Sequence, residues 1–428
     1  MAKQSAVIVG TGIAGLSLAE ILSRNNYKVI LLEAQGRIGG EASLATQKWH
    51  HSGWLYAALP NPSAMMGCYN ALHLYKRIYG DVFPGLINLK LDGKTVEYVK
   101  NDNGWFTDER IHYLYAMSTH EFSLPMKIYW PLYFSFVIMR RLKKFYNFAP
   151  IHNINTPLKD LLNLWENNNK GHQRYRCIRT TDAKIQTERV TRALVSALST
   201  DTEIITNASF SVKEDGDSTR ITIDGIPFTP DVLIFASGKS IPMHLKMINK
   251  TAIASKIKSV KSPIVILKET LDLPDFIRFT PNFSHTINHI TFDINGFGKV
   301  STLGSYYSFP VDQNPDISIF EDLICSRIGK TREDVLASYY GIKTEFVGKE
   351  DRRYNHSVMR VNRNTFFALA GKFCQFPLLV YDFVQQMGLS LTSTNMDDKL
   401  EVTADVFAAT YPHTLVSNYA ESQQPQVA

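Results

Sequence analysis

The sequence predicts an α/β protein of two domains: a discontinuous, Rossmann-like domain that binds a dinucleotide, and an α+β substrate domain built on an antiparallel sheet. Three observations lead to this fold class. Residues 5–33 carry a complete strand, helix, strand pattern. A later apolar strand pattern, residues 231–238, ends at a glycine turn and returns the chain to the same parallel sheet. Residues 262–311 contain short strand patterns without helices between them, which indicates antiparallel pairing.

The βαβ unit begins with the β-branched run 6–9 and continues with G-x-G-x-x-G at Gly10, Gly12 and Gly15. Gly10 permits a tight turn, Gly12 lets a pyrophosphate approach the backbone, and Gly15 lets the helix pack close to the strands. The helix N-terminus then directs unpaired N–H groups and its positive dipole end at the phosphates. Glu33 ends the second strand, where its carboxylate accepts hydrogen bonds from ribose hydroxyls and repels a 2′-phosphate.

Length and composition limit the classes of function that this chain can have. A chain of 428 residues has room for two domains, or for one domain with a large insertion. A net charge of +6 without a nucleic-acid motif argues against a nucleic-acid partner. The four cysteines show neither a C-x-x-C pair nor metal-ligand spacing, so we expect free thiols in a reducing cytoplasm and no metal site. The strand at residue 6 leaves no room for a signal peptide, and no apolar run is long enough to span a membrane.

A glycine-rich loop, residues 36–43, follows the second strand and should lie near the cofactor phosphates. We expect Arg37 and the Ser43 hydroxyl to contact pyrophosphate oxygens, with a solvated charge as the equal alternative for Arg37. Residues 48–54 then place two tryptophans and the pair His50 and His51 close together. A histidine beside a tryptophan is either a core residue or part of a site.

These segments resemble the flavoprotein superfamily of D-amino acid oxidase, glycine oxidase, sarcosine oxidase and glycerol-3-phosphate dehydrogenase. The βαβ unit ending in Glu33, the loop GRIGGEAS at 36–43 and the segment 51–63 carry the resemblance. His51-Ser52-Gly53 resembles a segment of the L-2-hydroxyglutarate dehydrogenase branch that lies near the flavin ring.

A second alignment of the histidines remains open. In the dimethylglycine dehydrogenase branch, a segment similar to Trp49-His50 followed by Gly53 carries a histidine linked covalently to the flavin. The two alignments place different histidines, His51 or His50, at the flavin ring. Both stay candidates for the catalytic base, since imidazole titrates near neutral pH.

Two later segments match the superfamily in the expected order, and this favours FAD over NAD. The superfamily places main chain near Ser209 or Phe210 at the adenine, and the strand ending at Ser237-Gly238 at the dinucleotide. A turn at Gly371, with Lys372 as a positive charge, resembles the turn that directs a helix N-terminus at the flavin pyrimidine. The cofactor contacts implied by the resemblance are Gly10, Gly12, Ile13, Ala14, Gly15, Glu33, Ala34, Arg37, Gly40, Ala42, Ser43, Ser209, Phe210, Ser237, Gly238, Gly371, Lys372 and Phe373.

The resemblance implies an FAD-dependent oxidase or dehydrogenase that oxidises a C–OH or C–N bond of a small molecule by hydride transfer to flavin N5. The hydroxy-acid branch is slightly favoured because of His51-Ser52-Gly53. Tyr306, Arg353 and Arg360 are the candidate substrate contacts, since a guanidinium binds a carboxylate with two hydrogen bonds. The alternatives are a flavin monooxygenase and a non-catalytic flavin-binding subunit docked on a membrane or partner.

Residues 122–148 are rich in aromatic side chains and end in basic residues. One interpretation is a peripheral membrane contact of a cytoplasmic protein; the favoured one is an aromatic wall of the substrate domain. Residues 317–328 and 331–340 have helical patterns. The expected division is 1–85, 155–245 and 355–415 for the FAD-binding domain, 86–154 and 246–354 for the substrate domain, and 416–428 for a polar tail.

Overall fold

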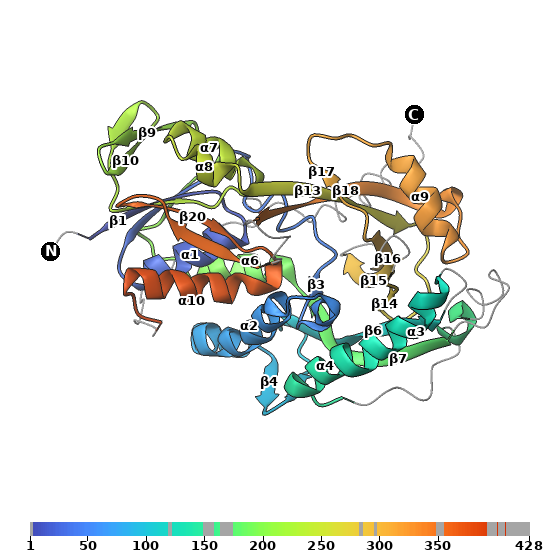
Figure 1. The fold of residues 1–428 in the computed structure, drawn as a ribbon. Helices are drawn as coiled ribbons and strands as arrows, with labels where there is room; N and C mark the ends of the chain where they lie inside the picture. The colour runs from blue at the N-terminus through green and yellow to red at the C-terminus, as the bar shows by residue number, and fades with distance from the viewer. Residues whose placement is uncertain are drawn as a thin grey trace, which may run out of the picture.

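The computed structural model describes residues 3–118, 122–148, 158–162, 174–281, 286–294, 298–347, 355–391, 400 and 407. Two large sheets organise them (Figure 1). The predicted tail 416–428 lies outside the described residues, as does Arg353.

The first sheet is the predicted nucleotide-binding sheet, with the strand order β19-β20-β12-β1-β2-β8. All neighbours in it are parallel except β19, which runs antiparallel to β20. Every residue of β12 is buried, because helices or strands cover both faces of a parallel sheet. The strands are β1 (Ser5–Val9), β2 (Lys28–Leu32), β8 (Glu203–Ile205), β12 (Val232–Phe235), β19 (Ser357–Arg360) and β20 (Thr365–Leu369).

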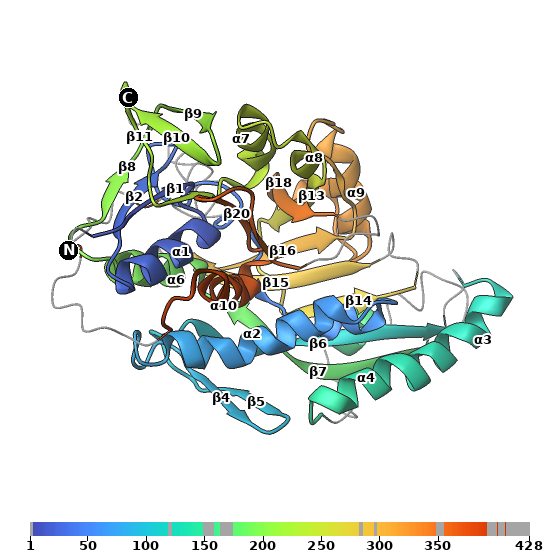
Figure 2. The same cartoon turned by 60° about the vertical axis from the view of Figure 1, so that its left-hand side comes forward.

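Long helices cover one face of this sheet, and a small β-meander with the short helices α7 and α8 covers the other (Figure 2). The helical layer contains α1 (Ile13–Arg24), α2 (Ser63–Tyr79), α6 (Thr187–Ser196) and α10 (Phe376–Met387). The opposite layer contains β9 (Phe210–Asp215), β10 (Ser218–Ile223), β11 (Ile226–Phe228), η3 (Gly238–Ser240), α7 (Ile241–Met247) and α8 (Thr251–Ala254).

The second sheet follows the path β17-β13-β16-β15-β14-β6-β7-β3, with β18 paired to β13. It is antiparallel throughout except for the parallel pair of β14 and β6. Its strands are β3 (Trp49–His50), β6 (Phe106–Ser118), β7 (Arg174–Ile185), β13 (Ile257–Leu267), β14 (Phe276–Phe279), β15 (Ile287–Ile294), β16 (Gly298–Ser305), β17 (Phe309–Pro310) and β18 (Val335–Phe346).

Smaller elements complete the described chain. They are η1 (Trp54–Ala58), β4 (Leu89–Asp92), β5 (Thr95–Tyr98), α3 (Leu124–Tyr133), the π-helical turn η2 (Phe134–Ile138), α4 (Met139–Phe145), α9 (Ile317–Ser326), η5 (Arg332–Asp334) and η6 (Phe373–Gln375). No helix in the described ranges has the length and apolar character needed to cross a bilayer.

Two local expectations differ from the structure. The pattern at 331–340 is not a helix: after η5 the chain forms β18, whose pairing along the full length of β13 outweighs the helical spacing. Residues 174–185, expected in the FAD-binding domain, form β7 of the second sheet, because β7 pairs with β6. The edge strand β3 also joins this sheet from within the stretch 1–85.

Candidate active site

A cavity of about 620 Å³ is lined by residues from both sheets. Its lining begins at the carboxyl ends of β1, β2 and β12, where ligands bind in open parallel sheets. It continues to the turn before α10 and to β15, β16 and β18 of the second sheet. A single continuous cavity therefore runs from the nucleotide-binding edge of the first sheet to the second sheet.

The N-terminus of α1 forms one part of the lining. Gly10 has φ +107°, and a Cβ there would lie 2.8 Å from the Ala236 carbonyl oxygen. A Cβ on Gly15 would lie 1.8 Å from the Gly10 oxygen, so the predicted close packing of helix and strand requires this glycine. The Ile13 N–H donates to the Ser43 hydroxyl at 2.9 Å, and the first turn of α1 carries no acidic side chain. This cradle fits a pyrophosphate.

Glu33 is fixed beside this turn. Its carboxylate accepts hydrogen bonds from the Thr11 N–H at 3.2 Å, from the Thr11 hydroxyl and from the Gln35 N–H at 2.9 Å. The Ala208 N–H donates to the Glu33 carbonyl at 2.8 Å, which brings the start of β9 to the same place. Glu33 and Phe210 both line the cavity, on the side where the sequence predicts the ribose and adenine.

The turn before α10 forms the far part of the lining. Gly371 has φ +66°, and a Cβ there would lie 2.3 Å from the Asn355 carbonyl oxygen. The ammonium group of Lys372 lies 3.9 Å from the Glu345 carboxylate and 5.6 Å from the centre of the Tyr56 ring. The positive end of α10 and this lysine therefore lie on the same side of the cavity.

The predicted cofactor residues gather here with two exceptions. Gly15 contacts the turn and not the cavity, and Arg37 is exposed on the loop and lies outside the lining. The solvated alternative for Arg37 is therefore the one that the structure shows. The predicted residues that line the cavity are Gly10, Gly12, Ile13, Ala14, Glu33, Ala34, Gly40, Ala42, Ser43, Ser209, Phe210, Ser237, Gly238, Gly371, Lys372 and Phe373.

His50 is the last residue of β3 and His51 follows it, and the two side chains lie in different surroundings. His51 lines the cavity beside Trp49, with ring centres 4.4 Å apart. His50 is fully buried away from the cavity, against the rings of Tyr75 and Phe106. Burial lowers the pKa of His50 to about 3, so this ring stays neutral. The geometry therefore brings His51, and not His50, to the cavity.

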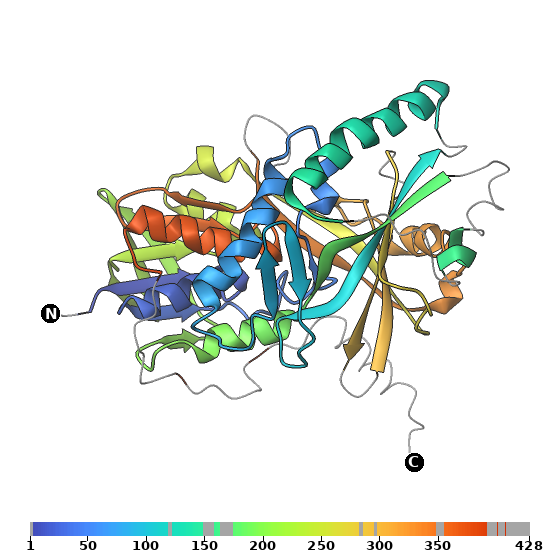
Figure 3. The same ribbon diagram turned by 90° about the horizontal axis from the view of Figure 1, so that it is seen from below.

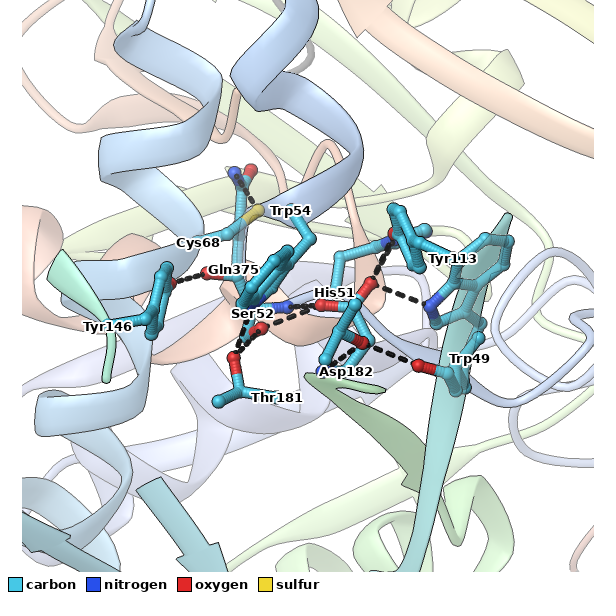
Figure 4. A network of polar contacts seen from close by, with 12 residues as sticks. Trp49, His51, Ser52, Trp54, Cys68, Tyr113, Tyr146, Thr181, Asp182 and Gln375 are labelled. Carbon is cyan, nitrogen blue, oxygen red and sulfur yellow. Dashed lines mark hydrogen bonds and ion pairs between the residues drawn. The ribbon is translucent and has the colours of Figure 1, made fainter. Parts of the chain in front are cut away.

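A buried carboxylate lies behind His51 (Figure 4). Asp182 of β7 accepts hydrogen bonds from Trp49 Nε1 at 3.0 Å, from the Tyr113 hydroxyl at 2.6 Å, and from the N–H and hydroxyl of Ser52 at 2.8 and 2.6 Å. His51 Nδ1 lies 3.7 Å from the same carboxylate, which is beyond hydrogen-bond range but within electrostatic reach. Asp182 thus links three strands beneath the cavity.

Burial and neighbouring charges set different charge states for His51 and Asp182. Burial lowers the pKa of His51 below its ordinary value; Asp182 raises it in part, and the charges of Lys372 and Lys343 lower it further. Burial by itself raises the pKa of Asp182, but the interactions with His51, Ser52 and Tyr113 outweigh it and lower that pKa. At neutral pH a neutral imidazole therefore faces the cavity and an anionic carboxylate supports it.

The second sheet supplies polar groups that the sequence pattern did not single out. Lys343 of β18 lines the cavity, as do Thr286 and Asn288 at the start of β15. Among the described residues, Thr286 Oγ1 and Asn288 Oδ1 are buried without a hydrogen-bond partner, so a ligand has polar atoms to satisfy here. Predicted Tyr306 also lines the cavity.

Predicted Arg360 lies elsewhere. It is exposed on edge strand β19, with its guanidinium 4.8 Å from the centre of the Phe366 ring and outside the cavity lining. The expectation that Arg360 contacts substrate is therefore not supported. The sequence analysis did not identify Lys343 and Asp182. The available signal was a charged residue within a strand pattern, but the pattern does not show with which strands that segment pairs.

A Rossmann-like sheet, a phosphate cradle, and a cavity that reaches a second antiparallel sheet define a dinucleotide-binding protein of two domains. The family model described as FAD dependent oxidoreductase matches residues 5–369, and the chain belongs to this family. The superfamily expected from the sequence is thus confirmed, and with it FAD as the cofactor. Among the described residues no cluster of histidine, cysteine or acidic side chains could hold a metal.

Similar proteins were found by sequence and by structure. A stretch of 100 residues is 36% identical to an L-amino acid oxidase of Cerastes cerastes, and one of 106 residues is 32% identical to an L-amino acid dehydrogenase of Synechocystis sp.. These stretches cover 23% and 24% of this chain but only 16% and 22% of those proteins. The L-α-glycerophosphate oxidase of Mycoplasma pneumoniae, solved with FAD bound, superposes with a TM-score of 0.62 at 15% identity, covering 94% of this chain and 100% of that one.

Proposed function

We propose that this enzyme oxidises the C–N bond of an amino acid or a related small, anionic amine. The observation that carries the proposal is the presence of His51 and Lys343 in the same cavity as the FAD cradle; burial lowers the pKa of His51, which favours the neutral ring. A neutral imidazole takes the substrate N–H proton, and an ammonium group pairs with a carboxylate. The local similarity to L-amino acid enzymes supports this choice of substrate.

When bound, FAD would supply a hydride acceptor at N5, and oxidation of the substrate C–N bond would leave an imine. The substrate loses two electrons and two protons in all. A hydride leaves the carbon, and a proton leaves the nitrogen. His51 receives that proton at Nε2, because Nδ1 is the atom nearer Asp182. Lys343, Thr286 and Asn288 orient the substrate from the second sheet, and the apolar walls exclude water.

We assign two supporting roles. Asp182 is a positioning residue: its hydrogen bond to Trp49 and its charge beside Nδ1 fix the His51 ring in one orientation. Lys372 lies in the turn before α10 and lines the cavity, so with the positive end of that helix it would favour negative charge on a bound flavin.

The same arrangement accepts the O–H proton of a 2-hydroxy acid, so the L-2-hydroxyglutarate branch is the second candidate, carried by His51-Ser52-Gly53. A flavin monooxygenase and a non-catalytic subunit are not favoured. His51 is also the histidine we propose for any covalent link to the flavin, because His50 lies outside the cavity.

The test is an anaerobic substrate screen. Purified protein should show flavin absorption bands, and these should bleach with an L- or D-amino acid or an N-substituted glycine. Matched 2-hydroxy acids, including L-2-hydroxyglutarate, form the second arm. Bleaching by hydroxy acids alone would replace the C–N proposal with the C–OH one, and bleaching by neither class would contradict both.

We also propose a cytoplasmic location with a peripheral membrane contact through residues 122–148. The four cysteines are free and buried, as fits a reducing compartment. The inward side of this segment, with Trp130 and Phe134, packs in the hydrophobic core, as the favoured interpretation of an aromatic wall of the substrate domain expects; none of residues 122–148 lines the cavity.

A further inference from the structure

The helical segment formed by α3, η2 and α4 packs through one side against β6 of the second sheet and against η1. Trp130, Phe134, Ile138 and Leu142, spaced four residues apart, are buried. Trp130 Nε1 donates to the Ala116 carbonyl of β6 at 2.8 Å. Figure 3 shows this helix along the outer edge of the molecule. The segment is therefore a fixed part of the fold, and its outward side is presented rigidly.

The outward side is apolar over its first three turns. Leu124, Ile128, Leu132 and Phe136 also follow a spacing of four and have exposed fractions of 75%, 63%, 52% and 71%; Tyr129 beside them is 59% exposed. Five of the eleven exposed large hydrophobic side chains among the described residues thus lie on one helix. Scattered apolar side chains are normal on a surface, but a contiguous row indicates a binding surface.

Basic side chains continue this row toward the end of α4. Arg140, Lys143 and Lys144 are exposed there, and Lys127 is exposed within the apolar part. Residues 122–148 contain no aspartate or glutamate. An apolar row with a cationic border complements a bilayer whose headgroups are anionic, whereas a protein partner would need a matching acidic patch and apolar groove.

We infer that the exposed face made of Leu124, Ile128, Tyr129, Leu132, Phe136, Arg140, Lys143 and Lys144 docks on an anionic lipid surface, with the helix in the plane of the interface. The inference extends the peripheral contact proposed above and is independent of the substrate. Apolar side chains enter the headgroup region while the basic end pairs with lipid phosphates. Because the helix is already folded, binding needs no ordering of this segment.

The first experiment is flotation of the full-length holoenzyme with two kinds of vesicle. One is made of phosphatidylcholine alone, and the other also contains roughly 30–40% of the anionic lipid phosphatidylglycerol. Binding should require the anionic lipid and weaken as salt is raised. The double variant Ile128→Glu with Leu132→Glu should lose binding by at least tenfold, as should Lys143→Glu with Lys144→Glu. Ile226→Glu is the matched control, since Ile226 is 70% exposed on β11, in the other domain.

A second experiment places a polarity-sensitive dye on the face itself. All four native cysteines are buried, so Leu132→Cys can be labelled selectively, with Ile226→Cys as its control. The Leu132 label should shift to the blue when anionic vesicles are added, and the Ile226 label should not.

Three results would overturn the inference: no flotation with anionic vesicles, equal binding by the Ile128→Glu, Leu132→Glu variant, or a blue shift that grows with protein concentration without lipid. The last result would assign the face to a second copy of the chain. Flavin bleaching by substrate is measured separately on the same variants. Loss of vesicle binding with normal bleaching therefore distinguishes this surface from the catalytic proposal.

Discussion

The hydroxyl of Tyr113 donates to the carboxylate of Asp182 at 2.6 Å, inside the second sheet and directly beneath the cavity. Tyr113 lies on β6 and Asp182 on β7, so the contact ties the two longest neighbouring strands below His51. Burial and the adjoining carboxylate raise the pKa of Tyr113 well above its ordinary value, and the hydroxyl keeps its proton to donate. Neutral hydrogen-bond donors thus stabilise the negative charge of Asp182. His51 is then the group nearest to Asp182 that titrates around neutral pH.

Replacement of Asp182 by asparagine should slow flavin reduction by roughly tenfold, because the His51 ring loses its electrostatic support. The reactive form of His51 is the neutral base, so the rate should rise with pH through the pKa of His51, at a midpoint below 6.5. Asp182 raises that pKa, hence Asp182→Asn should move the midpoint lower still. Stopped-flow reduction across pH 5–8, about the range in which histidine titrates, measures both.

The control for this variant is Tyr113→Phe, which removes one hydrogen bond and keeps the charge of Asp182. Its midpoint should stay close to that of the unaltered enzyme. A histidine NMR titration of the flavin-free protein gives the pKa of His51 without turnover. An unchanged His51 pKa in Asp182→Asn would show that the carboxylate is only structural.

Lys343→Met should raise the KM for an anionic amino acid by roughly 10- to 100-fold, because the variant loses one hydrogen bond between charged groups. The limiting rate should change much less, since the lysine binds the carboxylate in both ground and transition states. For the corresponding amino acid amide, which has no carboxylate, the KM should be the same in Lys343→Met and in the unaltered enzyme. Lys258→Met is the control, since Lys258 is an exposed residue of β13 outside the cavity lining. Equal effects on acid and amide would contradict the anchoring role.

His50 should make the folded protein sensitive to acid. Its pKa is about 3 in the folded state and 6.5 when solvated, so the unfolded chain binds more protons between these values. This contribution to the unfolding free energy is constant above pH 6.5 and is lost as pH falls, by at most about 1.4 kcal/mol per pH unit. In His50→Phe the slope between pH 6.5 and 4.5, roughly, should decrease by up to this amount.

Urea unfolding at several pH values measures that slope. The ring nitrogens of His50 have no hydrogen-bond partner among the described residues, and its neighbours are Tyr75, Tyr98 and Phe106. Phenylalanine should therefore be accepted at this position at neutral pH. An identical pH slope in the two proteins would mean that His50 is solvated or paired.

Local patterns predicted the parts of the site whose contacts are near in sequence. Gly10, Gly12 and Glu33 belong to one βαβ unit, so their spacing alone defines the phosphate cradle. The strand β12 was also predictable, because an uninterrupted apolar run fits only a strand buried on both faces.

The substrate side could not be predicted in the same way. Lys343 and Asp182 reach the site through the pairing of β18 with β13 and of β7 with β6, and strand partners far apart in sequence leave no periodic signal. The choice between His50 and His51 depended on which face of the short strand β3 meets the cavity, and that follows from its pairing with β7. Arg37 and Arg360 showed the chemistry expected of anion ligands, but the fold leaves both on the surface.

Gly371→Ala should destabilise the protein more than Gly388→Ala, although both glycines have φ +66°. Alanine at either position incurs the left-handed backbone penalty of about 1–2 kcal/mol. At Gly371 the added Cβ would also lie 2.3 Å from the Asn355 carbonyl oxygen, whereas at Gly388 it meets nothing within 4 Å. Relief of the clash moves the turn that lines the cavity before α10, so Gly371→Ala should also release FAD more readily. Urea unfolding and flavin fluorescence during dialysis measure the two effects; equal values for the two variants would contradict the close approach at Gly371.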